Sequence, residues 1–203
     1  VRVDIAPGQE FCSLTVRNDA PDNVTVQLRG YRWRQGAEGE DMLDPVPRLI
    51  LNPSIVTLAP GKRQLVRCSI PSDVSVPEET FRILVNELPS LAPDAVGLQT
   101  LLQISIPVFR SEPQARPQIV WSRRGDGCIA LTNAGAAHAR LASVQLRTAG
   151  SVAERAHQGF YLLAGASRAL GPCGSAGEPV IGVEATLGDG SVSALEQRSA
   201  ASQ

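Results

Sequence analysis

Leu98-Gln99-Thr100-Leu101-Leu102-Gln103-Ile104-Ser105-Ile106-Pro107-Val108-Phe109-Arg110 is the stretch that decides the fold prediction. Aliphatic and polar side chains alternate along most of it, which is the period of two expected of a β-strand with one apolar face. The run over residues 81–89 is also typical of a strand. The apolar row of the first run is long for a strand whose other face is polar. It could complete this protein's own core or pair with another chain, and that choice decides the function.

The composition indicates one large or two small globular domains that are rich in turns. The 203 residues are 43% apolar and include 15 Pro and 18 Gly. Short alternating runs separated by turn clusters fill both halves, and few segments lack Pro and Gly for long enough to form a helix. The polar segment over residues 111–117 contains two prolines and is typical of a stiff linker. We therefore predict an all-β chain with two immunoglobulin-like β-sandwich domains in tandem, over residues 1–112 and 118–203, joined by a linker over residues 113–117.

Charge and motif content exclude several functions. The net charge of -1 and the absence of a dense Lys/Arg run argue against nucleic acid as a partner. No apolar run approaches the roughly 20 residues needed to span a bilayer, so direct membrane insertion is not expected. No GxSxG motif is present, and His138 and His157 lie in small-residue or polar stretches away from any cysteine. We predict no catalytic residue, cofactor or metal site.

Four cysteines allow three disulfide pairings, and the sequence alone does not choose among them. Cys12 begins one predicted strand and Cys68 ends another; the two meet if these strands are antiparallel neighbours. Similar reasoning pairs Cys128 with Cys173 in the second half. The preferred pairing is therefore Cys12 with Cys68 and Cys128 with Cys173, which implies an oxidising compartment.

A series of motifs in order through nearly the whole chain resembles the periplasmic chaperones of the chaperone-usher pilus pathway. The ending over residues 106–109 is most similar to the archaic branch, typified by spore-coat-U-type pili. The motifs are Leu51-Asn52-Pro53, Leu58-Ala59-Pro60-Gly61, Gln64-Leu65-Val66-Arg67, Phe81-Arg82, Glu87-Leu88-Pro89, Ile104 to Arg110, Leu131 to Gly135 and Tyr161 to Arg168.

The resemblance implies a function for the apolar row. Pilus subunits are incomplete sandwiches, and the seventh strand of a family chaperone fills the gap. The implied protein is a periplasmic chaperone, with its two sandwiches in a boomerang-like arrangement, that binds pilus subunits and delivers them to an outer-membrane usher. An exposed apolar edge also favours self-association when the chaperone is free. The implied donor residues are Leu98, Leu102, Ile104 and Ile106, each of which could instead pack inside its own domain.

The resemblance also implies charged sites. Family members hold the C-terminal carboxylate of the subunit with an Arg in the first strand and a Lys in the seventh. Arg2 matches the first, but no Lys or Arg lies between Arg82 and Arg110. We expect Arg82 to substitute, although it could equally be a surface arginine or the partner of a carboxylate. Glu87, Arg110 and Asp189 are expected to form an interdomain charged network; Asp189 could instead only form its turn.

Two alternative functions are open at this point. A tandem-sandwich adhesin or structural pilus component would share the strands and disulfides, but would lack a strand able to complement another chain. A carbohydrate-binding sandwich would use exposed aromatic side chains, and the chain has only two Trp, two Tyr and four Phe. We predict the chaperone function and no enzymatic activity.

Overall fold

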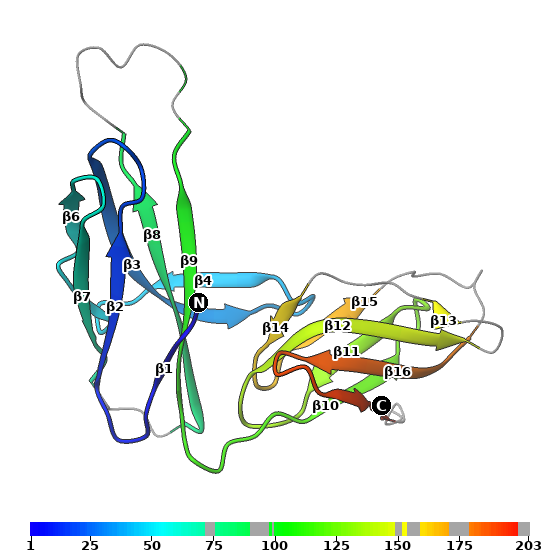
Figure 1. The fold of residues 1–203 in the computed structure, drawn as a ribbon. Helices are drawn as coiled ribbons and strands as arrows, with labels where there is room; N and C mark the ends of the chain where they lie inside the picture. The colour runs from blue at the N-terminus through cyan, green and yellow to red at the C-terminus, as the bar shows by residue number, and fades with distance from the viewer. Residues whose placement is uncertain are drawn as a thin grey trace. The chain divides into compact units, whose positions relative to one another are not determined.

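The computed structural model describes residues 1–71, 76–89, 98, 100–148, 152–153, 159–170 and 179–198. All secondary-structure elements in these ranges are β-strands, which confirms the predicted all-β class (Figure 1). The strands of the N-terminal half are β1 (Val3–Ile5), β2 (Phe11–Arg17), β3 (Val24–Gln35), β4 (Asp41–Pro45), β5 (Ile50–Asn52), β6 (Ile55–Leu58), β7 (Arg63–Ser69), β8 (Glu78–Glu87) and β9 (Gln103–Ser111).

In the described part of the C-terminal half, the secondary-structure elements are also β-strands. They are β10 (Ile119–Arg123), β11 (Ile129–Asn133), β12 (Ala139–Thr148), β13 (Val152–Ala153), β14 (Phe160–Leu162), β15 (Ser167–Leu170), β16 (Val180–Leu187), β17 (Val192–Ala194) and β18 (Glu196–Gln197).

The chain forms two compact units. The first comprises Val1–Trp33 and Leu43–Pro113, and the second comprises Arg34–Met42 and Gln114–Gln203. The change of unit at Pro113 falls at the predicted linker. Residues 34–42, at the tip of the β3–β4 hairpin, group with the second unit because the Gln35 amide donates to the Tyr161 carbonyl and accepts from the Leu163 N–H, at 2.9 Å each.

The first unit is a sandwich of two sheets. One sheet has the order β1-β9-β8-β3-β4, with β6 also paired to β3, and the other has the order β2-β7-β5. Alternate residues of both sheets point inward and share one core, as in other sandwiches. The buried members of this core are Ile5, Val26, Leu28, Leu49, Val66, Cys68, Ile70, Phe81, Ile83, Val85, Ile106 and Val108.

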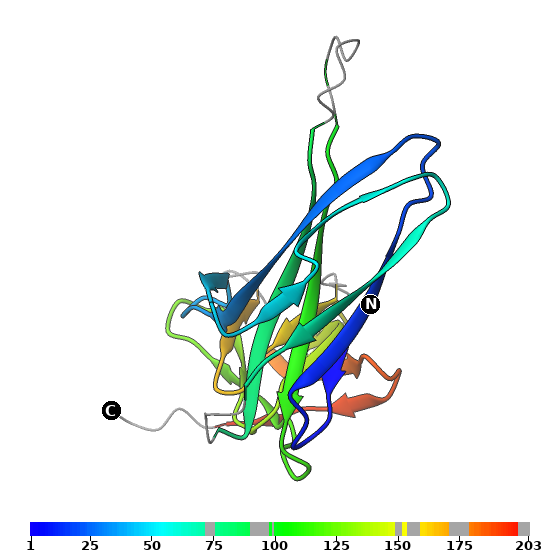
Figure 2. The same ribbon diagram turned by 90° about the vertical axis from the view of Figure 1, so that its left-hand side faces the viewer.

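β8 and β9 form the longest pairing of the first unit. They are antiparallel, with Ile83 opposite Ile106 and Val85 opposite Ile104. Figure 2 shows these two green strands running side by side. The predicted strand over residues 98–110 therefore exists, but it begins at Gln103 in the structure.

The second unit is also a sandwich. Its sheets have the orders β15-β11-β10-β18 and β13-β12-β16-β17, with β14 paired to β12. The predicted hairpin turn over residues 188–191 joins β16 to β17, and Gly190 there has φ of 87°, a conformation that favours glycine. The buried core members are Trp121, Ile129, Leu131, Leu141, Val144, Leu146, Phe160, Leu162, Leu170, Val183 and Ala185.

Candidate functional site

The apolar row of β9 changes from exposed to buried along one face of the strand. Ile104 and Ile106 lie opposite the buried Val85 and Ile83, so this row belongs to the core face of the sheet. The exposed fraction falls from 60% at Leu102 and 45% at Ile104 to 7% at Ile106 and 0% at Val108. The apolar row therefore extends beyond the core, to residues that the side chains of this unit cover only in part.

The exposed end of β9 also has an unpaired backbone edge. β8 pairs with all of β9, whereas β1 pairs, in parallel, only with Val108–Arg110. Over the described residues, the 103–107 part of β9 has no strand on its second side. The Leu102 carbonyl accepts a hydrogen bond from the Glu87 N–H of the β8 side at 2.9 Å. Because backbone groups alternate in direction along a strand, those of Gln103 and Ser105 point to the open edge.

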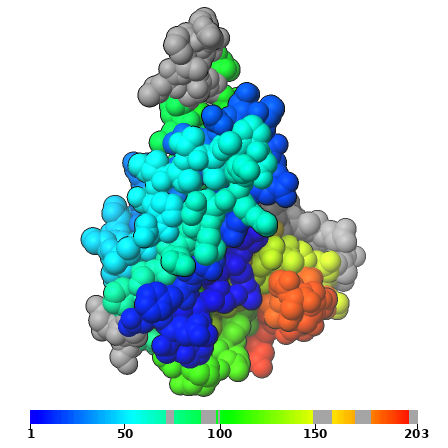
Figure 3. All heavy atoms as spheres, turned by 60° about the vertical axis from the view of Figure 1, so that its left-hand side comes forward, coloured from blue at the N-terminus to red at the C-terminus, as the bar shows by residue number. Residues whose placement is uncertain are grey.

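The structure supports three of the four predicted donor positions as accessible. Leu98 is fully exposed, and Leu102 and Ile104 are about half exposed. Ile106 differs from these three, because its side chain is 7% exposed and packs in the core of its own unit, the alternative that the sequence left open. Leu101, at 44% exposed, is a further accessible aliphatic residue that the prediction left out, although its apolar character was visible in the sequence. Figure 3 shows green side chains, near residue 100 on the colour bar, at the upper end of this unit.

Arg82 lies on the opposite, outer face of the same sheet. Its guanidinium carbon is 3.6 Å from the centroid of the Trp33 ring, a cation–π geometry. Its Nη1 also donates to the Ser105 hydroxyl at 3.4 Å. The Trp33 ring packs in turn against Phe109, with centroids 5.9 Å apart. The aromatic pair therefore holds this guanidinium in a defined position on β8.

Arg2 and Arg82 lie at one level of the sheet. Arg82 is the partner of Pro107 on β9, and Arg2 immediately precedes the Val3–Val108 pair of β1 and β9. Two strand spacings therefore separate the two arginines, about 10 Å, and residues in one row share a face. Arg2 forms an exposed ion pair with Asp4 at 2.9 Å. Pro107 lies between the two arginines on β9 and is uncharged, so β9 itself contributes no cation at this level.

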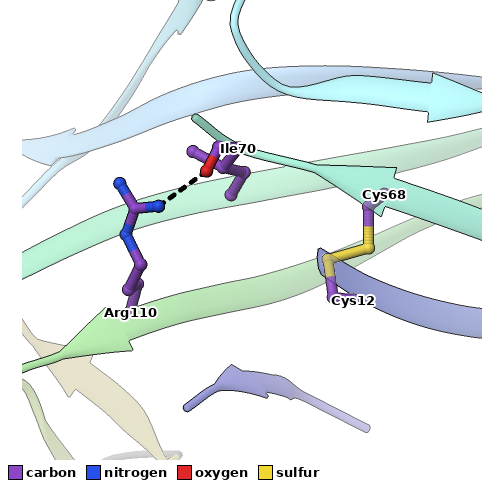
Figure 4. Close-up of a disulfide and its surroundings, with 4 residues drawn as sticks. All are labelled: Cys12, Cys68, Ile70 and Arg110. Carbon is purple, nitrogen blue, oxygen red and sulfur yellow. Dashed lines mark hydrogen bonds between the residues drawn. A yellow bond between two sulfur atoms is a disulfide. The ribbon is translucent and has the colours of Figure 1, made fainter. Parts of the chain in front are cut away.

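Arg110 belongs to a buried cluster that the sequence analysis missed. It forms an ion pair with Glu79. Its Nη1 also donates to the Ile70 carbonyl, as Figure 4 shows. Glu79 also accepts from Arg48 at 3.0 Å, and the Arg48 guanidinium donates to the Pro71 carbonyl at 2.8 Å. The cluster of Arg48, Glu79 and Arg110 thus ties the end of β7 to β8 and β9.

The three residues expected to form an interdomain network have other described contacts. Arg110 contacts Glu79, as above, and Glu87 accepts from the Leu102 N–H at 3.0 Å. Asp189 accepts from the hydroxyl and the N–H of Ser191, and these hydrogen bonds lower its pKa below the usual value. The network remains a prediction.

The predicted Cys12–Cys68 disulfide is present in the first unit (Figure 4). The two cysteines are direct cross-strand partners of β2 and β7, as the strand argument required. Cys128 is also disulfide-bonded. Its predicted partner, Cys173, lies outside the described residues.

The described residues also bear on a metal site and on a membrane-spanning helix. Among the described residues, no group of three His, Cys, Asp or Glu side chains is placed to hold a metal ion. The described part of the chain also contains no helix long and apolar enough to cross a membrane.

The fold is that of an all-β protein with two sandwiches. In the described part of the first sandwich, the exposed end of β9 has an open backbone edge. Residues 1–116 match the model of the N-terminal domain of the pili and flagellar-assembly chaperones. The chain belongs to this family, whose function is that of a chaperone and is not enzymatic. By sequence, no match is found among the curated proteins.

Solved structures share the fold over nearly the whole chain. The chaperone in the CsuC-CsuE chaperone-tip adhesion subunit complex, from archaic Csu pili of Acinetobacter baumannii, aligns with a TM-score of 0.77 at 18% identity, covering 98% of this chain and 96% of that one. The E. coli chaperone DraB aligns with a TM-score of 0.65 at 20% identity, covering 97% and 93%. The structure of the Salmonella enterica SafA pilin with the SafB chaperone aligns with a TM-score of 0.64 at 18% identity, covering 95% and 89%.

Proposed function

We propose that this chain is a periplasmic chaperone that binds pilus subunits by donor-strand complementation and delivers them to an outer-membrane usher. The single observation that carries the proposal is the exposed end of β9, where an apolar row continues out of the core beside a backbone edge that none of the described strands pairs with. A strand of this kind can add to an incomplete sheet of another chain. Backbone hydrogen bonds then provide affinity, and alternate side chains provide specificity.

The exposed row supplies part of the free energy of a contact. Leu102 and Ile104 are 60% and 45% exposed, so burial of the area still exposed would contribute roughly 1.5–3 kcal/mol in total before ordering costs, at about 1.5–3 kcal/mol for one fully exposed aliphatic side chain. Leu98 and Leu101 precede β9 in the chain and add further exposed apolar area. The open edge at Gln103 and Ser105 supplies the backbone groups that a partner strand would pair with.

The proposed partner is a pilus subunit with an incomplete sandwich. Two of the structural neighbours are complexes of a chaperone with a subunit, a tip adhesion subunit in one and a pilin in the other. The likeness to the Csu chaperone also favours the archaic branch for this chain. The disulfide between Cys12 and Cys68 is consistent with the oxidising periplasm.

Arg2 and Arg82 are the proposed anchors for the C-terminal carboxylate of the subunit. Both lie at the level of Pro107, which follows Ile106, the first buried residue of β9. A guanidinium can bind a carboxylate through two parallel hydrogen bonds. Arg82, held over the Trp33 ring, would replace the seventh-strand lysine of the family.

The test is co-expression of the chaperone with a candidate subunit, followed by co-purification. We expect the Leu102→Asp/Ile104→Asp double variant to lose the subunit, because charged side chains cannot enter apolar pockets without a large desolvation cost. The matched control is Ile50→Asp/Ile55→Asp, which changes two equally exposed isoleucines of β5 and β6. It should retain the subunit.

Equal recovery with both double variants would overturn the donor role of β9. The alternative of an adhesin or structural pilus component predicts that no small subunit co-purifies with the wild-type chain at all. Circular dichroism of each variant establishes that a loss of binding does not come from unfolding.

A further inference from the structure

The ladder between β8 and β9 does not stop at its last backbone pair. That pair is Asn86 with Gln103. One residue further, the Glu87 N–H donates to the Leu102 carbonyl at 2.9 Å, and the Glu87 Oε2 accepts from the Leu102 N–H at 3.0 Å. Both backbone groups of Leu102 are therefore bonded to one residue of β8.

The carboxylate takes the place of a backbone carbonyl in this arrangement. In a regular antiparallel pair, the Leu102 N–H would donate to the backbone carbonyl of its partner. Leu88, the next residue, continues the ladder with β3, because its N–H donates to the Thr25 carbonyl at 2.8 Å, and Pro89 follows, which has no N–H to donate. The Glu87 side chain therefore extends the pairing of β9 by one residue beyond the last backbone pair, Asn86 with Gln103.

A second side-chain contact closes the same end of the ladder. The Gln103 amide nitrogen donates to the Asn86 amide oxygen at 2.5 Å. Asn86 and Glu87 thus bind consecutive residues of β9, Gln103 and Leu102, each through a side chain. These contacts lie where β9 is exposed and has no second neighbouring strand in the described part of the sheet.

We propose that Glu87, assisted by Asn86, is a positioning residue that holds Leu102 in the strand conformation, so that Leu102 and Ile104 present one continuous row to the subunit. The inference rests on the proposed donor function of β9. Without the carboxylate, Leu102 would lose a hydrogen bond and regain backbone freedom, and the subunit would have to order it on binding. Preorganisation of this kind strengthens binding without any contact between Glu87 and the subunit.

The first measurement uses the free chaperone. We expect Glu87→Ala to raise the amide hydrogen exchange rate of Leu102, read by NMR on the full chain, by about tenfold, because the acceptor of that N–H is removed. Glu87→Gln retains an acceptor oxygen and should restore most of the protection. Glu112→Ala, which removes an exposed glutamate just after the other end of β9, is the matched control and should leave Leu102 unchanged.

The second measurement uses the subunit recovered in the co-purification experiment. Glu87→Ala should weaken its binding by roughly three- to tenfold, with Glu87→Gln close to the wild type, because one net hydrogen bond corresponds to a factor of this size. Unchanged exchange of Leu102 or unchanged affinity in Glu87→Ala, with binding still abolished by Leu102→Asp/Ile104→Asp, would overturn the positioning role and leave the donor function standing. Full binding by that double Asp variant would instead overturn the donor function, and with it the role of Glu87 in binding.

Discussion

The two ends of β9 differ in sequence and in burial: polar and aliphatic residues alternate as far as Ser105, and four apolar residues follow from Ile106. The segment from Leu102 to Ser105, which leads into β9, is exposed, and within the described residues β8 is its one neighbouring strand. From Ile106 to Arg110 the strand is buried, and β1 pairs with its last part, Val108–Arg110. The buried end anchors the strand in the core of its own unit, and the anchored strand then presents the exposed end in an extended conformation.

If β9 is the donor strand proposed above, the difference gives it a fixed part as well as a free part. An isolated strand is not stable in water, so an exposed apolar row must be continuous with a core. The change occurs between Ile104 and Ile106, two neighbours on the same face. Substitutions on either side of this point therefore separate stability from binding.

The largest expected contrast is between Ile106→Asp and Ile104→Asp. A carboxylate at position 106 would be buried in an apolar core and should lower the free energy of unfolding by about 5 kcal/mol, enough to unfold many domains. At position 104 the carboxylate reaches solvent, so we expect a change within about 0.5 kcal/mol. Urea denaturation followed by far-UV circular dichroism measures both.

Subunit recovery completes this comparison. Ile104→Asp should remain folded and lose most of the subunit. A folded and stable Ile106→Asp protein would mean that the core does not enclose that position, and the boundary between the two ends of β9 would have to move.

The buried ion pair at the anchored end gives the next largest effect. Glu79→Ala should lower the free energy of unfolding by about 3–5 kcal/mol, because it leaves the Arg110 guanidinium buried without its counter-charge. The neighbouring Glu78→Ala is the matched control: Glu78 is less buried and accepts from the Ser111 hydroxyl at 2.7 Å. That substitution should cost about 1 kcal/mol. Equal losses in thermal or urea denaturation would argue against a special role for the buried pair.

Two smaller substitutions, each to alanine, compare how much side-chain packing contributes to stability at the two ends of β9. Val108→Ala removes two fully buried methyl groups and should cost about 2 kcal/mol. Leu102→Ala removes more atoms from an exposed side chain and should cost less than about 0.5 kcal/mol in the free chaperone. Denaturation curves check the stability, and the order of the two variants should reverse when subunit binding is measured.

Much of this organisation was predictable from the sequence, and the rest depended on neighbours in space. Alternation predicted the strand containing Ile104 and Ile106, and antiparallel strand geometry predicted the Cys12–Cys68 pair. Alternation could not predict that burial begins at Ile106, because the cover there comes from segments far away in the chain. The ion pair of Glu79 and Arg110 was missed for a similar reason. Pro77-Glu78-Glu79-Thr80 has the composition of a polar turn, and only the register of β8 with β9 places Glu79 opposite Arg110.

The smallest expected effect concerns Arg82, which lies opposite Pro107 near the start of the buried end of β9. Arg82→Ala removes the stacking on Trp33 and should lower the free energy of unfolding by only about 0.5–1 kcal/mol. Arg29→Ala, an exposed arginine on the same outer face of β3, is the matched control and should be nearly neutral.

Binding distinguishes a carboxylate anchor from a stacked surface residue at this position. If Arg82 holds the C-terminal carboxylate of the subunit, Arg82→Ala should weaken binding of the unmodified subunit by about tenfold or more, as expected for a hydrogen-bonded charge pair. The same substitution should have little effect on a subunit whose C-terminus is amidated, because that partner has no terminal carboxylate to lose. An equal loss with both subunits would mean that Arg82 acts through the packing of Trp33 and Phe109. This part of β8 and β9 would then contribute shape complementarity to the complex. Arg2 would be the remaining proposed anchor for the C-terminal carboxylate of the subunit.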